Sequence, residues 1–311
     1  MPRGDLKSAL SRLPAARQIE LHERVELRAW TTLRVGGPAD LMVRCTSEVA
    51  VLQVLELLAE RGLSYFVMGA GSNLVICDQG LRPPVITLGG ELAQWEVDLD
   101  GVEAGGGANL TQVCRAVARA GLSGLERLLG VPGSIGGAVV MNAGAYGVEI
   151  FDLLEWAKLA GSRDGLRMVA GTDIDHGYRW SELTAGDDIV VRARLALESD
   201  DLASINQRIR EVNLQRRQKL PPGTSAGSVF KNPEGDYAGR LLEACGCKSL
   251  RCGGAQVSER HANVIVSSRG ATASDILVLA RQMRARVRET FNIELDPEVR
   301  FIDEQGRRIP L

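Results

Sequence analysis

The hydrophobic positions of the first 75 residues predict a strand, a helix and a second strand. A glycine turn followed by alternating apolar residues predicts a strand within 31–45, and Ser47 predicts the start of a helix that reaches about Arg61. Gly62 predicts the end of that helix, and the apolar run 63–68 predicts a buried strand. One face of the helix carries apolar residues at helical spacing: Val51, Leu55 and Leu58.

The middle of the chain, residues 75–199, predicts many short strands and one helix. The helix covers about Leu110 to Ala120, and Gly121 predicts its end. The predicted strands lie at 84–88, within 95–107, and at 155–162, 166–171 and 188–197. This part is therefore expected to be α+β and rich in turns.

A different pattern begins after Ser199. A helical face starts at Leu202 and the helix ends before Pro221-Pro222; a helix at 237–245 follows, capped by Asp236. Apolar residues at helical spacing mark the faces of the first helix and of a long helix further on: Leu202, Ile205, Ile209 and Val212, then Ile276, Leu279, Met283 and Val287. Strands are predicted at 262–267 and 298–302. We therefore expect an α+β fold of three units with the bounds 1–74, 75–199 and 200–311, of which the first is a small α/β unit and the other two are α+β.

Composition places the chain among globular proteins. Hydrophobic residues make up 45% of the 311 positions and charged residues 24%, with a formal net charge of −2, which argues against a nucleic-acid or anionic-membrane partner. No apolar run approaches the roughly 18 residues of a spanning helix. The first residues lack the apolar core of a signal peptide, so a cytoplasmic protein with reduced thiols is expected.

The six cysteines give no metal-binding pattern. Cys45, Cys77 and Cys114 stand singly among apolar residues and are interpreted as small core residues. A second group consists of Cys245, Cys247, Cys252 and His261. It lacks the paired spacing of a zinc site, so no metal site is predicted.

Two glycine-rich segments are the first candidates for ligand binding. Residues 130–147 hold six glycines in an otherwise apolar run, which predicts a buried cradle for a flat or phosphorylated ligand rather than a regular helix. The loop 69–74 follows a predicted strand. It departs from the dinucleotide fingerprint because Leu74 stands where the third glycine would be. Its main-chain N–H groups could bind a pyrophosphate, or the loop could be a tight turn between strands.

Three polar residues are candidates for chemistry, each with a plain alternative. Arg179 lies between Tyr178 and Trp180, which favours a partly buried guanidinium over a surface one. Ser228 begins the polar stretch SVFKNP in a loop. No GxSxG motif accompanies it, so a proton-donating hydroxyl is favoured over a hydrolytic nucleophile. Glu298 could be a surface carboxylate at a strand edge or an acid beside an arginine.

Five segments, taken in their order along the chain, carry a resemblance to a known family of proteins: 69–73, 130–147, 178–181, 227–233 and 295–302. Together, over roughly Thr31 to Ile302, they resemble the UDP-N-acetylenolpyruvoylglucosamine reductases, also called UDP-N-acetylmuramate dehydrogenases. The resemblance implies a flavoenzyme of peptidoglycan precursor synthesis. In this family NADPH reduces bound FAD, which then reduces the enolpyruvyl ether of UDP-N-acetylglucosamine. It also implies two subdomains of an FAD-binding module of the vanillyl-alcohol-oxidase type, followed by an α+β substrate-binding domain.

The resemblance assigns roles by position. Ser228 matches the proton donor of the family, and Arg179 and Glu298 match the groups that stabilise the developing enol. With these roles, Tyr178, Lys231, Asn232 and Lys219 are expected to bind the substrate. FAD is expected to be held by Gly69, Ala70, Gly71, Ser72, Asn73, Leu74, Gly133, Ser134, Gly136, Gly137, Asn142 and Ala143, without a covalent bond, because neither glycine-rich segment contains histidine.

Further details of the sequence bear on the subtype. Gly227 follows Ser181 by 46 residues, which leaves no room for the tyrosine-bearing loop of one branch of the family. The chain therefore resembles the shorter branch, expected to act as a monomer on a small molecule. Two alternatives remain: a binding protein without catalysis, and another FAD oxidase or dehydrogenase acting on a hydroxyl group.

Overall fold

A computed structural model describes residues 3–311, so residues 1 and 2 of the predicted first unit lie outside the described residues. The described chain groups into two compact units that interleave in sequence. Among the described residues, the first unit consists of 3–23, 41–70 and 84–213, and the second of 24–40, 71–83 and 214–311. The expected division at 74 and 199 stays a prediction.

The first unit contains a four-stranded sheet in the order β1-β2-β5-β3, of which β1 and β2 begin or end in the second unit. Strands β2, β5 and β3 run parallel to one another. The elements of this part are α1 (Arg3–Leu10), β1 (Ile19–Glu26), β2 (Pro38–Cys45), α2 (Glu48–Glu60), β3 (Phe66–Val67) and β5 (Val85–Leu88). Helix α2 starts where expected, since the Ser47 side chain accepts a hydrogen bond from Ala50 N.

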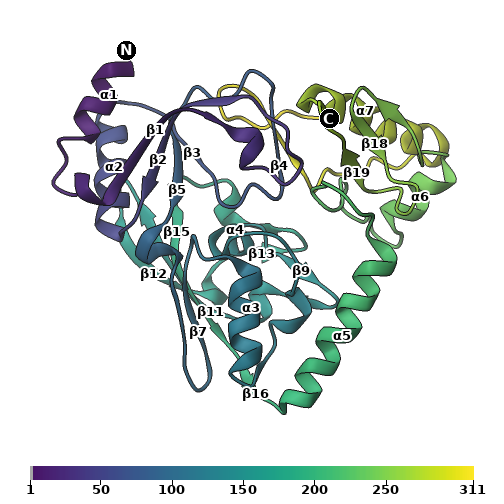
Figure 1. Ribbon diagram of the computed structural model, residues 1–311, viewed down its shortest axis with the longest axis horizontal. Coiled ribbons are helices and arrows are strands. Elements are labelled where there is room, and N and C mark those ends of the chain that lie inside the picture. Colours follow the sequence, from purple (N-terminus) through teal and green to yellow (C-terminus); the bar gives the residue numbers. More distant parts are fainter. Residues whose placement is uncertain (1–2) are drawn as a thin grey trace. The chain divides into compact units, whose positions relative to one another are not determined.

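A five-stranded antiparallel sheet, in the order β12-β11-β15-β7-β6, forms the rest of the first unit. Helices α3 and α4 pack against it (Figure 1). Its elements are β6 (Trp95–Val97), β7 (Gly101–Gly105), α3 (Leu110–Arg119), α4 (Ile135–Val140), β11 (Leu154–Gly161), β12 (Gly165–Ala170) and β15 (Ile189–Ala196). Short two-stranded pairs accompany it: β8 (Leu122–Ser123) with β16 (Glu198–Ser199), β9 (Gly144–Ala145) with β10 (Val148–Glu149), and β13 (His176–Gly177) with β14 (Trp180–Ser181).

Two apolar cores hold the first unit together. One lies between α2 and the four-stranded sheet and reaches Ala160 and Val191 of the larger sheet. The other surrounds α3 and α4 and includes Val113, Val117 and Leu195. The predicted face of α2 is confirmed, since Val51, Leu55 and Leu58 are all buried, and the buried residues of α3 include Val113 and Val117.

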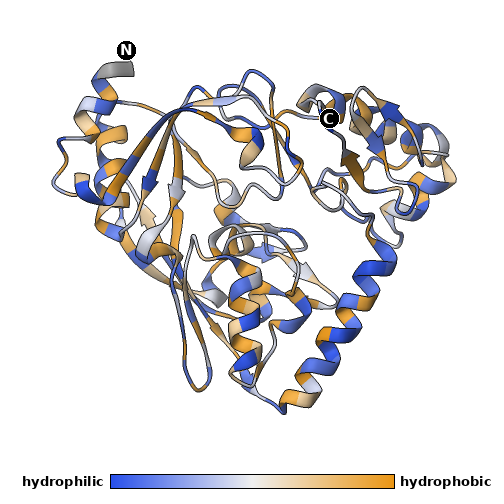
Figure 2. Ribbon diagram, viewed as in Figure 1, coloured by the Kyte–Doolittle hydropathy of each residue, from blue (hydrophilic) through white to orange (hydrophobic). Residues whose placement is uncertain are grey.

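Helix α5 (Leu202–Lys219) runs from the first unit into the second. It is hydrophilic over most of its length (Figure 2), and Ile205 and Val212 are its buried residues. Leu202, predicted on the same face, is 49% exposed. The predicted helix is confirmed, but its apolar face is narrower than expected.

The second unit is built around a long helix, α7 (Ala273–Phe291). The predicted apolar face of α7 is confirmed, since Ile276, Leu279, Met283 and Val287 are all buried. The other elements are β4 (Leu74–Ile76), α6 (Ala238–Ala244), β17 (Arg251–Cys252), β18 (Ala255–Val257), β19 (Ile265–Ser267) and β20 (Arg300–Ile302). Strand β20 pairs in parallel with β4, which brings residues 71–83 into this unit.

Three details differ from the expectations. The strand predicted at 63–68 shortens to β3, in which Val67 is 41% exposed rather than buried. The N-cap of α6 is Tyr237, and Asp236 instead accepts from Tyr237 N and pairs with Arg240, because it lies one residue too early to cap the helix. Cys77 is only half-buried, whereas Cys45 and Cys114 are core residues as predicted.

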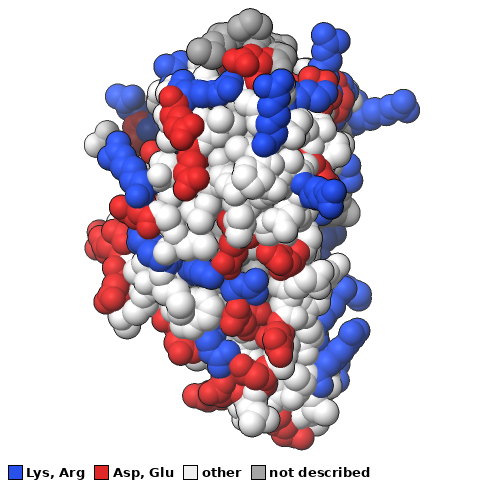
Figure 3. Space-filling view, turned by 90° about the vertical axis from the view of Figure 1, so that its left-hand side faces the viewer, with Lys and Arg blue, Asp and Glu red and all other residues white. Residues whose placement is uncertain are grey.

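The described surface carries charges of both signs. Positive and negative side chains are mixed over the face drawn in Figure 3. Among residues 3–311, no group of three or more His, Cys, Asp or Glu side chains could hold a metal ion. No helix of the described chain is long and apolar enough to cross a membrane.

Candidate active site

Arg179 lies in the first unit, in the tight turn between β13 and β14, with a left-handed φ of 59°. Its side chain is 17% exposed, which confirms the predicted partly buried guanidinium. Nη1 donates to Glu149 Oε1 at 3.2 Å and Nη2 to the Gly144 carbonyl at 2.5 Å. The guanidinium also lies 4.8 Å from the ring centroid of Tyr178, within the range of a cation–π contact.

Asn142 is the buried centre of the same cluster. It is 1% exposed and adopts a φ of 41°. Its Nδ2 donates to Glu149 Oε2 at 2.7 Å and to the Gly177 carbonyl at 3.0 Å, while its Oδ1 accepts from Phe151 N at 3.2 Å. The structure thus brings together two of the predicted residues, Arg179 and Asn142, through Glu149, which sequence reasoning missed.

The glycine-rich segment 130–147 contains a short helix, α4, contrary to the expectation. Ser134 caps it by accepting from Gly137 N, and the N–H groups of Ile135 and Gly136 donate to the carbonyls of Ala108 and Gly106. A Cβ at Gly136 would stand 3.0 Å from Gly106 O and 3.1 Å from Val190 O. Glycine therefore lets the helix pack closely on β15, and this packing outweighs the poor helix propensity of glycine.

Unlike the start of α4, the loop 69–74 presents main-chain N–H groups that could bind a ligand. Within the described residues, the main-chain N–H groups of 69–73 donate no hydrogen bond, whereas the N–H groups at the start of α4 are engaged inside the first unit. The carbonyls of Gly71 and Ser72 accept from Thr32, and Gly71 has a φ of 62°. Successive N–H groups around a left-handed glycine suit a pyrophosphate, so these residues fit the nucleotide part of FAD.

Ser228 and Glu298 lie in the second unit on neighbouring extended segments. Glu298 N donates to Val229 O at 2.8 Å, and Phe230 pairs with Pro297 in an antiparallel bridge. Asn73 Nδ2 donates to the Glu298 carbonyl at 2.9 Å. The structure therefore brings together three predicted residues, Asn73, Ser228 and Glu298, although they are far apart in the sequence.

Asn263 is a second residue that sequence reasoning missed. It is 2% exposed, and its side chain binds both main-chain groups of Phe230: Oδ1 accepts from Phe230 N at 2.9 Å and Nδ2 donates to Phe230 O at 2.8 Å. Its own carbonyl accepts from Val229 N at 2.9 Å. Asn263 thus fixes the course of the chain directly after Ser228.

The remaining predicted residues are placed as follows. Tyr178 is 46% exposed in the first unit, next to Arg179. Lys219 is exposed at the end of α5, and Lys231 N donates to the Asp296 carbonyl. Asn232 Oδ1 accepts from Ala238 N at 3.1 Å, so one end of its side chain serves the start of α6. Gly69, Ala70, Gly133, Ser134, Gly137 and Ala143 lie in the first unit, and Ser72 and Leu74 in the second.

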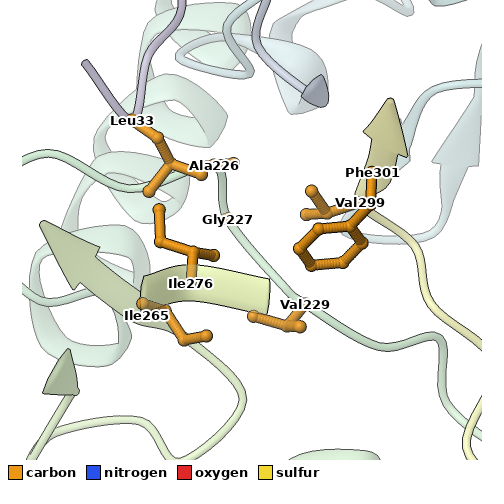
Figure 4. Close-up of a pocket in the computed structure, with 8 residues that line it drawn as sticks. All are labelled: Leu33, Ala226, Gly227, Val229, Ile265, Ile276, Val299 and Phe301. Atoms are coloured by element: carbon orange, nitrogen blue, oxygen red, sulfur yellow. The ribbon is translucent and has the colours of Figure 1, made fainter. Parts of the chain in front are cut away.

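A small cavity lies beside the loop that carries Ser228 (Figure 4). Its volume is about 10 Å³, and its lining is apolar, with Val229 and Phe301 among the residues. A space of this size holds at most about one water molecule. It is therefore a packing gap within the second unit and not a site for a flavin or a nucleotide.

Comparison with known proteins shows the family to which the chain belongs. The family described as FAD binding domain matches residues 39–168, and the C-terminal domain of UDP-N-acetylenolpyruvoylglucosamine reductase matches residues 217–302. Relatives with the name UDP-N-acetylenolpyruvoylglucosamine reductase include one from Heliobacterium modesticaldum, 41% identical over 90% of this chain and 90% of the relative. Another, from Clostridium botulinum strain 657, is 39% identical over 90% of this chain and 92% of the relative.

A solved structure also matches most of the chain. The crystal structure of UDP-N-acetylenolpyruvylglucosamine reductase from Thermus caldophilus matches with a TM-score of 0.80 and 39% identity, over 91% of this chain and 99% of that one. The fold and these matches define an FAD-dependent oxidoreductase, with an FAD-binding module followed by a separate C-terminal domain, as the sequence predicted. The chain belongs to the UDP-N-acetylenolpyruvoylglucosamine reductase family.

Proposed function

We propose that the protein reduces the enolpyruvyl ether of UDP-N-acetylglucosamine to UDP-N-acetylmuramate, with NADPH as the reductant. This reaction takes place in the cytoplasm and supplies a precursor of peptidoglycan. It thereby serves cell-wall synthesis, cell shape and cell division. Family membership over 90% of the chain carries the proposal. The pairing of the Ser228 and Glu298 segments supports it, because two of the residues assigned to the reaction then lie on adjacent extended chains.

FAD is the cofactor of the proposed reaction. When bound, it would supply the hydride chemistry that couples oxidation of NADPH to reduction of the substrate's double bond. The N–H groups of 69–73 would hold its pyrophosphate, since they donate no hydrogen bond among the described residues. The residues of 133–143 would line the flavin through main-chain and small side-chain contacts.

Arg179 is proposed to stabilise the negative charge that develops on the substrate. When the terminal carbon of the double bond gains hydrogen, charge spreads over the neighbouring carbon and its carboxylate. A guanidinium held in place by Glu149 and Gly144 needs little rearrangement to meet that charge. One preorganised donor of this kind contributes about 3 kcal/mol to transition-state stabilisation.

Ser228 is proposed to donate the proton that completes the reduction. Its hydroxyl would protonate the carbon next to the carboxylate from one face, which fixes the configuration of the lactyl ether. Glu298 is proposed to share in stabilising the enol. Lys231, Asn232, Lys219 and Tyr178 are proposed to bind the substrate, and the protein is proposed to act as a monomer.

Stopped-flow absorbance of the flavin tests the function. The purified protein should be yellow, NADPH should bleach the flavin band, and the enolpyruvyl substrate should restore it. In Ser228→Ala, bleaching should continue at the wild-type rate while restoration by substrate collapses. The exposed Ser268→Ala is the matched control and should leave both steps unchanged.

Two results would contradict the proposal. A colourless protein without affinity for FAD would exclude the flavin reaction. Equal loss of both half-reactions in Ser228→Ala would assign the serine a structural role instead of proton donation.

A further inference from the structure

Glu149 is the feature that the proposed reaction leaves without a role. It ends the short strand β10 (Val148–Glu149), and its main-chain N–H donates to Asp152 Oδ2 at 2.8 Å. Its carboxylate is about two-thirds buried, with 32% of the side chain exposed, and lies between the buried Asn142 and the guanidinium of Arg179. No motif of the sequence marks this residue.

The two carboxylate oxygens of Glu149 have different partners. Oε1 accepts from Arg179 Nη1 at 3.2 Å, and Oε2 accepts from Asn142 Nδ2 at 2.7 Å. Asn142 cannot turn its amide to offer an oxygen, because Oδ1 already accepts from Phe151 N and Nδ2 also donates to the Gly177 carbonyl. Both positions at residue 149 must therefore be acceptors, which an ionised carboxylate provides and an amide does not.

The lack of a side chain at Gly144 leaves space for the contact between Arg179 and Glu149. A Cβ at residue 144 would stand 2.7 Å from Arg179 Nη1 and 2.8 Å from Glu149 Cγ, closer than such contacts are found. The carbonyl of the same glycine accepts from Arg179 Nη2. The guanidinium is thus held at two nitrogens, by Glu149 and by a residue that any side chain would push against the pair.

We propose that Glu149 is a positioning residue that holds the guanidinium of Arg179 in the orientation used for catalysis. It does so by linking Arg179 to the rigid, buried Asn142, so that the arginine is oriented before substrate binds. This role rests on the proposed function, since it acts through the charge that Arg179 offers to the developing enol. Glu149 itself needs no contact with substrate.

Glu149→Gln tests the role, because it keeps the size of the side chain and places an NH₂ group against one of two donors. We expect the rate constant for reoxidation of the flavin by saturating substrate to fall at least about tenfold, as part of the 10²- to 10³-fold effect of losing a preorganised donor. In variant protein that holds FAD, the rate of flavin reduction by NADPH should stay within about twofold of wild type, because this step does not use Arg179.

Glu155→Gln is the matched control. Glu155 accepts from Arg194 Nε at 2.8 Å, and Arg194 is 17% exposed, like Arg179, but none of the predicted site residues belongs to that cluster. This variant should leave both half-reactions unchanged. Glu149→Asp keeps an acceptor-only carboxylate that is one methylene shorter, and its reoxidation rate should lie between those of wild type and Glu149→Gln.

A double-mutant cycle with Arg179→Lys separates positioning from a general structural effect. If Glu149 acts through the guanidinium, the double variant should be reoxidised as slowly as Arg179→Lys alone, within about twofold. Losses that multiply would overturn the proposal, as would reoxidation of Glu149→Gln at the wild-type rate. Should Glu149→Gln fail to hold FAD, wild-type reoxidation in Glu149→Asp overturns the proposal, and a slower rate with intact NADPH reduction supports it.

Measurement of flavin reoxidation also distinguishes failure of the proposed function from failure of the proposed role of Glu149. A wild-type protein whose reduced flavin is not reoxidised by the enolpyruvyl substrate refutes the proposed function, and the role of Glu149 with it. Substrate reoxidation that is normal in wild type and unchanged in Glu149→Gln refutes the role of Glu149 alone.

Discussion

The side chain of Asn263 holds the chain beside Ser228, and its removal should loosen that segment by an amount that can be worked out. Asn263→Ala removes the partners of both the N–H and the C=O of Phe230, a residue that is 1% exposed. Each buried main-chain group left without a partner costs about 1–3 kcal/mol. The local cost should therefore be about 2–6 kcal/mol, well above that of an ordinary surface substitution.

Hydrogen exchange measured by mass spectrometry reports this cost locally. The N–H groups of Val229, Lys231 and Glu298 bond between the three neighbouring segments, so peptides covering 226–232 and 295–302 should exchange faster. A loss of about 2 kcal/mol corresponds to roughly 30-fold faster exchange at 25 °C. Peptides of the first unit should keep their wild-type rates.

Two further variants sharpen this test. Asn206→Ala, at an exposed position on α5, is the control and should change exchange nowhere near residue 229. Asn263→Asp keeps the acceptor for Phe230 N but turns an oxygen toward the Phe230 carbonyl, so the folded state should favour the protonated acid. That raises the pKa of the new carboxyl in the folded state above about 3.9, and the variant should lose stability as the pH rises through that value. Exchange in Asn263→Ala equal to the control would refute the reasoning.

Three other predictions concern stability and reactivity. Arg208→Ala should lower the free energy of unfolding by about 3–5 kcal/mol, because it removes the charged partner of Glu126. Glu126 is 4% exposed and accepts from Arg208 Nε at 2.6 Å. Thermal unfolding should show a much smaller loss of stability for Arg28→Ala, whose ion pair is exposed. Burial, with a contribution from a nearby lysine, lowers the pKa of His261. Unfolding by urea should therefore become easier as the pH falls below about 6.5, and His261→Gln should flatten that dependence, whereas an unchanged slope would contradict it. Burial raises the pKa of the Cys114 thiol to about 12, so iodoacetamide at pH 8 should label it only after unfolding; rapid labelling of the folded protein would contradict this.

Periodic apolar positions and residues at helix ends were enough to predict α2, α3, α5, α6 and α7, whereas α1 was not predicted. The spacing of Ile276 and Met283 predicted the buried face of α7, and the cap at Ser47 predicted the start of α2. These features depend on residues within one or two turns of each other, so they can be recognised in the sequence. The short helix α4 could not, because its two glycines are poor helix formers locally, and Gly136 is explained only by its close packing on Gly106 and Val190, which are distant in the sequence.

The same distinction between local and distant contacts applies to the site. Arg179 and Ser228 could be named because each stands in a motif with recognisable neighbours. Glu149 and Asn263 could not, because their roles come from partners 30 and 33 residues away along the chain. A glutamate and an asparagine in such stretches have many ordinary uses on a surface. What distinguishes them is that each satisfies two polar groups at once, Asn263 in the core and Glu149 beside the buried Asn142, and that arrangement exists only after folding. The sequence thus indicates the groups expected to carry the reaction, while the structure is needed to find the groups that fix their positions.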